Sequence, residues 1–156
     1  MRLEEFILFL HSTIFAFEET TEELMGAAKG AVINRARFKF AEYFDTASVF
    51  KELKADIGEK QSFDEKLETL RKYFNSDRDI FDKVLITKAG DEITFEIKEC
   101  FLAKTGIHDV LKTKRGICPM ALVFASLISE YGAVHIDNSE FNDNGTVTKI
   151  KIDTGK

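Results

Sequence analysis

The spacing of the apolar residues changes once along this chain of 156 residues, and that change limits the fold class. In the first half, apolar side chains recur at steps of three and four residues, which predicts amphipathic helices. In the second half, Ile93, Phe95 and Ile97 alternate with polar residues, which predicts strands with one buried face. We therefore expect an α+β fold, in which N-terminal helices pack on a small antiparallel sheet within a single domain spanning residues 1–156.

Several local signals mark where helices begin and where a strand turns. Ser62 and Glu65 form a capping box, in which each side chain can satisfy a free amide at the start of a helix. Pro119 suits the first turn of a later helix, which would place Cys118 near its N-cap. This later helix is apolar nearly all round, so we expect it to be buried between the sheet and the N-terminal helices, with a hairpin on either side. Asn144-Gly145 predicts the turn of the second hairpin.

The first predicted helix has more apolar surface than one buried stripe requires. Its expected core stripe consists of Leu3, Phe6, Ile7, Leu10, Ile14 and Phe17. Phe9 and Phe15 extend the apolar surface beyond this stripe. A second apolar surface on one helix indicates either a contact between two copies or a helix that is covered on both sides within the monomer. Glu18 and Glu19 follow, and we interpret them as part of a solvated face.

The charge balance and the apolar runs exclude some classes of protein. The formal net charge of −5 argues against nucleic-acid binding, which needs a basic surface. Arg35, Arg37 and Lys39 form a small basic group, which we interpret as the solvated face of a helix. The apolar run at the N-terminus is too short, and too interrupted at residues 11–13, to span a membrane. Two cysteines without a secretory signal indicate a reducing compartment, so we expect a cytoplasmic protein.

Phenylalanine is unusually frequent, with 15 Phe and no Trp. Such a composition indicates either a core built of Phe or a Phe-lined pocket for an apolar ligand. If a cavity lies between the N-terminal helices and the sheet, Phe40, Phe44 and Phe124 are our candidates for its lining. Each of the three also suits an ordinary core position.

The segment from Glu99 to Gly145 contains both cysteines, two of the three histidines and the single proline. Cys100, His108 and Cys118 lie within one loop-bounded part of it, and thiolate with imidazole is a ligand set that suits zinc. The helix that follows Cys118 would lower the pKa of its thiol and favour the thiolate. Ordinary structural roles explain the same residues, because free cysteine is often buried as a small hydrophobe.

A fourth zinc ligand is expected from the strand after Gly132. The chain should reverse tightly there, so that the end of the strand returns to the level of Cys118. Glu140 is in phase with Val134 and Ile136, and we therefore expect its side chain to point inward as the fourth ligand of a structural zinc ion. The alternative is a solvated strand end beside the hairpin.

A family resemblance rests on motifs in the second half of the chain. These are Glu99-Cys100, then Gly116-Ile117-Cys118-Pro119, then a helix of small and apolar residues through Ala125-Ser126 to Gly132, a strand, a turn at Gly145 and a last strand. In this order the chain resembles the 4-vinyl reductase, or hydrocarbon-binding, domain family. That family is similar in fold to subunits of the TRAPP vesicle-tethering complex and to haem-NO-binding sensor domains. The resemblance implies the NO-signalling/TRAPP-subunit fold, a homodimer, a bound apolar small molecule and, as in phenol-sensing regulators, a zinc site.

The zinc ligands of the family are only partly kept in this sequence. Cys118 matches the first zinc cysteine of the family pattern. The later ligands, an acid and two cysteines around the last hairpin, correspond to Asn138, Phe141 and about Lys149. A metal ion would therefore have to recruit other ligands, and the candidates are the cysteine, histidine and glutamate named above.

Three functions of different classes follow, in order of preference. The first is a regulatory module that binds an apolar small molecule and contains a structural zinc site. The second is a dimeric interaction or scaffold protein without an exchangeable ligand. The third is an enzyme of tetrapyrrole or aromatic metabolism, which we rank last because the sequence contains no nicotinamide or flavin motif, nucleophile elbow or phosphate loop.

Overall fold

The computed structural model describes residues 3–46, 50–76, 81–110, 114–137, 139–153 and 155. Within these residues, the first half of the chain forms the helices α1 (Leu3–Met25), α2 (Lys29–Thr46), α3 (Lys51–Gly58) and α4 (Phe63–Phe74). A short 3-10 turn, Gly26–Ala28, joins α1 to α2. The second half adds α5 (Phe101–Lys104), the 3-10 turns η2 (Ile107–Val110) and η3 (Ser129–Tyr131), and α6 (Pro119–Ile128).

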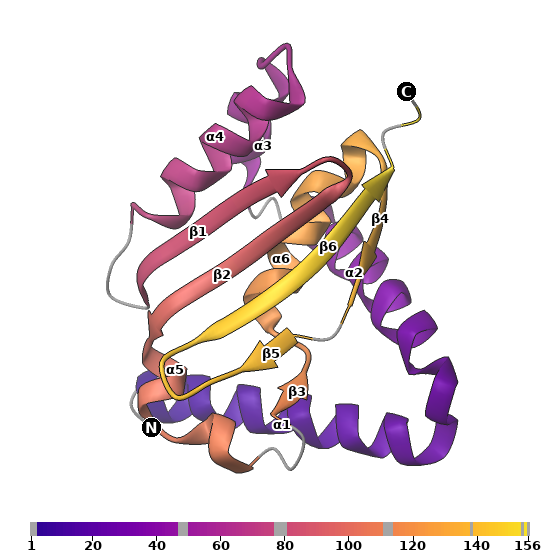
Figure 1. The fold of residues 1–156 in the computed structure, drawn as a ribbon, viewed down its shortest axis with the longest axis vertical. Coiled ribbons are helices and arrows are strands. Elements are labelled where there is room, and N and C mark those ends of the chain that lie inside the picture. The colour runs from indigo at the N-terminus through magenta and orange to yellow at the C-terminus, as the bar shows by residue number, and fades with distance from the viewer. Residues whose placement is uncertain are drawn as a thin grey trace.

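The described strands form one antiparallel sheet (Figure 1). They are β1 (Phe81–Ala89), β2 (Glu92–Cys100), β3 (Arg115–Gly116), β4 (Ala133–Ile136), β5 (Ser139–Phe141) and β6 (Thr146–Asp153). The order is β1-β2-β6-β5-β3, and β4 also pairs with β6. One edge of β6 therefore pairs with β2, while its other edge pairs first with β5 and then with β4. The predicted α+β class is confirmed.

Aromatic side chains join the helices to one face of the sheet. Phe124 of α6 stacks on Phe95 of β2, with 4.9 Å between the ring centroids. Phe74 of α4 packs edge-on against both rings. Its ring centroid lies 5.5 Å from that of Phe95 and 6.1 Å from that of Phe124. On the far side of α6, the hydroxyl of Ser126 donates to the backbone carbonyl of Arg37 in α2 over 3.2 Å. Helix α6 thus lies between the sheet and α2, as the sequence predicts.

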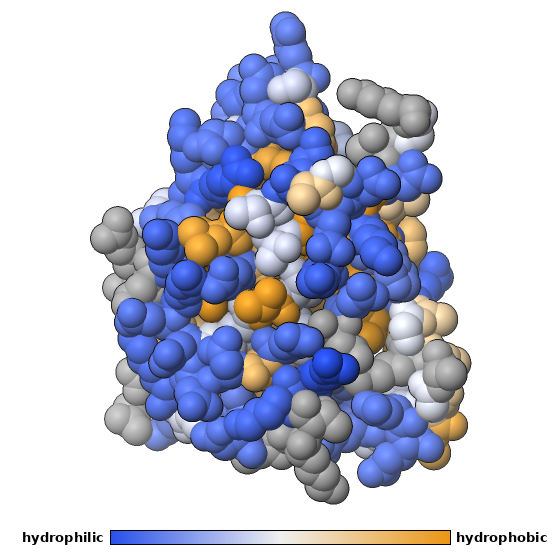
Figure 2. Space-filling model, in the orientation of Figure 1, coloured by the Kyte–Doolittle hydropathy of each residue, from blue (hydrophilic) through white to orange (hydrophobic). Residues whose placement is uncertain are grey.

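The opposite face of the sheet is turned to solvent. Ile93, Phe95 and Ile97 of β2 are buried under the helices, whereas the residues that alternate with them are half-buried or exposed. Figure 2 shows this outer face as mainly hydrophilic, with isolated apolar residues. The alternating pattern of β2 therefore predicts both faces of the sheet correctly.

The predicted helix start and hairpin turn are also confirmed. In the capping box, the hydroxyl of Ser62 accepts from the amide of Glu65 and the carboxylate of Glu65 accepts from the amide of Ser62. Asn142 and Gly145 close the turn between β5 and β6 with paired backbone hydrogen bonds. A Cβ atom at Gly145 would overlap the carbonyl oxygen of Ile97, so this position needs glycine for close approach to β2.

The expected core stripe of α1 is wrong where the structure describes it. Leu10 and Phe17 are exposed and Ile14 is half-buried, whereas the described residues that α1 buries are His11, Phe15 and Glu18. The side chains of the first three residues of the stripe lie outside the described residues. Helix α1 crosses the lower end of the sheet in Figure 1 and packs over β5 and the segment that leads into α6. That region offers the backbone amide of Ile117 to Glu18 and aromatic rings to Phe15 and His11.

The expectation that the basic group on α2 is a solvated face fails at one residue. Arg37 is only 2% exposed, so its assignment to a solvated face is wrong. Its position on α2 faces α6, where its carbonyl accepts the Ser126 hydrogen bond.

Among the described residues, no helix combines the length and the apolar character that crossing a membrane requires.

Candidate functional site

The two cysteines and His108 lie buried near the start of α6. Cys100 ends β2, and Cys118 is the N-cap residue of α6; both are free thiols. The hydroxyl of Thr146 points to the sulfur of Cys118 over 3.5 Å. Burial raises the pKa of the Cys118 thiol, and Cys100 raises it further, while the Thr146 hydrogen bond opposes them. The expected lowering of this pKa by the helix N-terminus is therefore outweighed by desolvation.

Glu140 does not point inward, and that expectation is wrong. Ser139 and Phe141 of β5 are buried, while Glu140 between them is exposed and paired with Arg115 at 3.2 Å. The reason is that Ala133–Ile136 and Ser139–Phe141 are separate strands, so the alternation does not continue from β4 into β5. Glu140 therefore lies on the outer face of the sheet, away from the buried cysteines.

The described side chains are not arranged as a metal site. In the part of the chain that the structure describes, no group of three or more His, Cys, Asp and Glu side chains is arranged to hold a metal ion. His108 is engaged instead through Nδ1, which lies 3.1 Å from the carbonyl oxygen of Asn142. Zinc binding by Cys100, His108 and Cys118 stays a prediction that needs an elemental measurement.

His11 of α1 lies against this region, which the sequence pattern did not indicate. Its ring centroid is 6.3 Å from that of His108 and 4.6 Å from that of Phe15. Burial, with a smaller contribution from His108, lowers the pKa of His11 to about 4. Burial also lowers the pKa of His108. Both imidazoles are therefore neutral at pH 7 and form, with Phe15 and Phe141, an aromatic cluster under α1.

Glu18 is the second polar residue that α1 buries, and its assignment to a solvated face is wrong. It is 6% exposed, and its Oε2 accepts a 2.7 Å hydrogen bond from the backbone amide of Ile117. A Cβ atom at Gly116 would lie 2.8 Å from the same oxygen, so the absence of a side chain there permits the approach. The spacing of seven residues between His11 and Glu18 places both on one helix face, but neither residue type marks a buried face in a sequence.

A cleft between α1, α2 and the start of α6 contains this carboxyl group. Its volume is about 190 Å³. The described lining residues are Ile14, Phe17, Glu18, Thr21, Val32, Ile33, Ala36, Phe40, Ile117 and Leu122. Glu18, Ile33 and Leu122 are buried and form the floor, whereas Phe17 is 71% exposed and forms the rim. Apart from Glu18 and Thr21, the described lining is entirely apolar.

The three phenylalanines expected around a cavity have different positions. Phe40 lines the cleft. Phe124 is fully buried between Phe95 and Phe74, so it belongs to the core and its assignment to a cavity lining is wrong. The side chain of Phe44 lies outside the described residues. The cleft itself lies between the two N-terminal helices, with α6 at its floor, rather than directly on the sheet.

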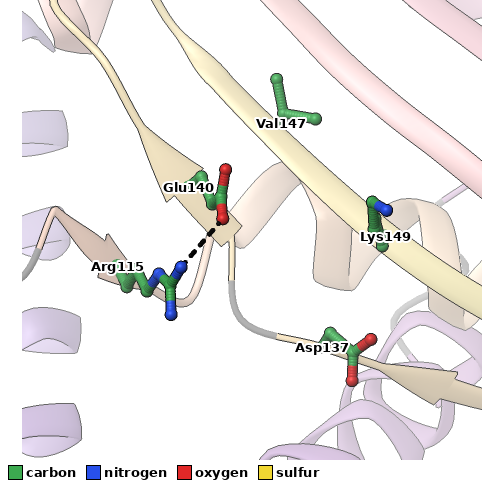
Figure 3. A pocket seen from close by; sticks show the side chains of 5 residues that line it. All are labelled: Arg115, Asp137, Glu140, Val147 and Lys149. Atoms are coloured by element: carbon green, nitrogen blue, oxygen red, sulfur yellow. Dashed lines mark hydrogen bonds and ion pairs between the residues drawn. The ribbon is translucent and has the colours of Figure 1, made fainter.

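A larger hollow of about 380 Å³ lies on the outer face of the sheet (Figure 3). Arg115, Asp137, Glu140, Val147 and Lys149 line it. Arg115 forms an ion pair with Glu140. Nζ of Lys149 lies 3.5 Å from Oε1 of Glu92, and Oδ1 of Asp137 lies 3.5 Å from Nε2 of His135. Exposed pairs of this kind are ordinary surface features, and the cleft between α1 and α2 is the better candidate for a binding site.

Comparisons of the chain with models of protein families, with curated proteins and with solved structures found no match. The resemblance to 4-vinyl reductase domains therefore stays a prediction.

Proposed function

We propose that this chain is a regulatory module that binds a small apolar molecule in the cleft between α1 and α2. The apolar lining of that cleft, which extends from the exposed Phe17 to the buried Ile33 and Leu122, supports the proposal. Binding sites for small molecules are typically concave and mostly apolar, with a few polar groups that orient the ligand. Glu18 and Thr21 are the polar side chains available here.

The volume of the cleft limits the size of the ligand. An apolar cavity of roughly 150 Å³ is large enough to bind benzene. A volume of about 190 Å³ therefore suits one six-membered ring with a short substituent, or an alkyl chain of similar size. Longer hydrocarbons would have to extend past Phe17 into solvent.

Toluene is a suitable neutral probe, and two alanines on α2 offer a matched pair of variants. Ala36 lines the cleft, whereas Ala31 on the same helix is exposed. The Ala36→Trp substitution fills the cleft, and Ala31→Trp adds the same side chain outside it. Toluene should raise the thermal unfolding temperature of the wild type and of Ala31→Trp, but not that of Ala36→Trp. Equal responses of the two variants, or none in the wild type, would contradict the proposal.

The second candidate function is that of a dimeric interaction protein, and the outer surface of α1 and α2 favours it. Among the described residues, the exposed large apolar side chains are Phe9, Leu10, Phe17, Leu24, Met25, Phe38, Tyr43 and Tyr73. All of them except Tyr73 lie on α1 or α2. An apolar patch concentrated on one part of a surface is typical of a protein–protein contact.

The solution mass separates this second function from the first. If α1 and α2 form a homodimer interface, light scattering should give twice the chain mass for the wild type. The double substitution Leu24→Ser with Phe38→Ser should give a monomer. Tyr73→Ser, which removes an exposed aromatic ring from α4, should leave the dimer intact. A wild type that is monomeric at all concentrations would exclude the homodimer.

A further inference from the structure

We infer that the cleft between α1 and α2 selects ligands that carry a protonated amine on a small apolar body. This inference rests on the proposed function and names the ligand class of the same site. The Glu18 carboxyl group is the feature that carries it. Among the described lining residues, Glu18 has the only ionisable side chain, and it lies at the buried end of the cleft.

The fold fixes the position of the Glu18 carboxyl group. Helix α1 carries the residue into the interior, and Oε2 accepts the Ile117 amide hydrogen over 2.7 Å. Gly116 makes room for the carboxyl group, since a Cβ atom there would lie 2.8 Å from Oε2. The segment that leads into α6 therefore holds the carboxyl group in one place, as an orienting group in a binding site must be held.

A carboxylate accepts several hydrogen bonds at once, because its two oxygens offer about four acceptor positions. A donor group of a ligand can therefore bind Glu18 beside the partners that the carboxyl group already has. Hydrogen bonds between an ammonium group and a carboxylate are roughly twice as strong as neutral ones. Surroundings that are largely apolar strengthen the interaction further by lowering the local dielectric constant.

The remaining lining residues favour a cation over an anion. Thr21 directs its hydroxyl donor to the carbonyl of Phe17 over 2.7 Å, so that donor is already used within α1. The described lining contains no lysine, arginine or histidine that could pair with a ligand carboxylate or phosphate. Arg37 follows Ala36 on α2 but is not part of the lining. A ligand with an acid group would place its negative charge near Glu18, and no described lining residue carries a positive charge that could pair with it.

Benzylamine, toluene and benzoate make a matched set of probes, because all three have one ring and differ in charge. At neutral pH benzylamine is a cation, since alkylamines resemble lysine in pKa. The affinities should be measured by calorimetric titration of the wild type, of Glu18→Gln and of Glu19→Gln. Glu18→Gln keeps the shape and an acceptor oxygen for Ile117. Glu19→Gln makes the same change at the next residue of α1, which is exposed and does not line the cleft.

The wild type and Glu19→Gln should bind benzylamine at least about tenfold more tightly than toluene, and benzoate most weakly. Glu18→Gln should bind toluene as the wild type does and lose the preference for benzylamine. Equal binding of benzylamine and toluene by the wild type, or a preference that survives in Glu18→Gln, would overturn the amine selectivity and leave the apolar binding function standing. Failure of all three probes to bind the folded wild type would overturn both.

Discussion

Gly116→Ala is the substitution that tests most directly how α1 is anchored. The new Cβ would lie 2.8 Å from Oε2 of Glu18 and 3.1 Å from a ring carbon of Phe141. The first distance is shorter than a carbon–oxygen contact allows, so the carboxyl group must retreat. Retreat breaks its 2.7 Å hydrogen bond from the amide of Ile117.

The expected cost follows from two opposing contributions. Loss of a hydrogen bond to a charged group costs about 1.5–3 kcal/mol. Replacement of glycine by alanine inside a strand returns about 0.5–1 kcal/mol, because the unfolded chain loses conformational freedom. We therefore expect Gly116→Ala to lower the free energy of unfolding by about 0.5–2.5 kcal/mol. In a Glu18→Ala background the hydrogen bond is already absent, so the same substitution should cost about 1.5–3 kcal/mol less.

Urea denaturation of the two single variants and the double variant measures this coupling. Gly58→Ala is the matched control, since nothing lies within 4 Å of a Cβ built at Gly58 and its backbone suits alanine. That control should be neutral or slightly stabilising. A Gly116→Ala variant as stable as the wild type, or one whose cost is unchanged when Glu18 is alanine, would refute the anchoring of α1 by Glu18.

Three further predictions test other parts of the structure. Because burial lowers the pKa of His11 from 6.5 to about 4, the unfolded state binds more protons than the folded state between these values. The contribution of His11 to the free energy of unfolding of the metal-free protein should be constant above pH 7 and should fall by up to about 3 kcal/mol as the pH drops to 4, so that His11→Leu shows a smaller fall. Phe124→Ala, which removes a fully buried ring from between α6 and β2, should cost about 3–5 kcal/mol in urea denaturation. Elemental analysis of protein prepared without chelator should find about one zinc per chain, lost in Cys118→Ser and in His108→Ala, if the zinc prediction holds; a metal-free wild type would contradict it.

The fold class could be predicted because the signals for it are local. Alternation along β2 depends on only a few residues, and the buried face of Ile93, Phe95 and Ile97 follows directly from it. The capping box at Ser62 and the turn before Gly145 likewise depend on neighbours in sequence. The uninterrupted apolar character of α6 was enough to predict a helix buried on both sides.

Apart from Phe40, the residues of the candidate site could not be predicted, because the site depends on how separate segments meet. The apolar stripe of α1 indicated Leu10 and Phe17 as core, yet the helix is rotated so that His11 and Glu18 face inward. Their partners, including the amide of Ile117, are about a hundred residues away in sequence and give no local signal. Glu140 was misplaced for a simpler reason, since a break between β4 and β5 resets the alternation.

Mapping of toluene binding by backbone amide NMR tests the proposed cleft most directly. Toluene should shift amide resonances of residues that line the cleft, such as Ile14 on α1, Val32 on α2 and Leu122 on α6, and should leave those of β1 unchanged. The same titration of Ala36→Trp should shift none of them. Shifts that are absent in the wild type, or centred on the hollow beside Arg115 and Lys149, would contradict binding between α1 and α2.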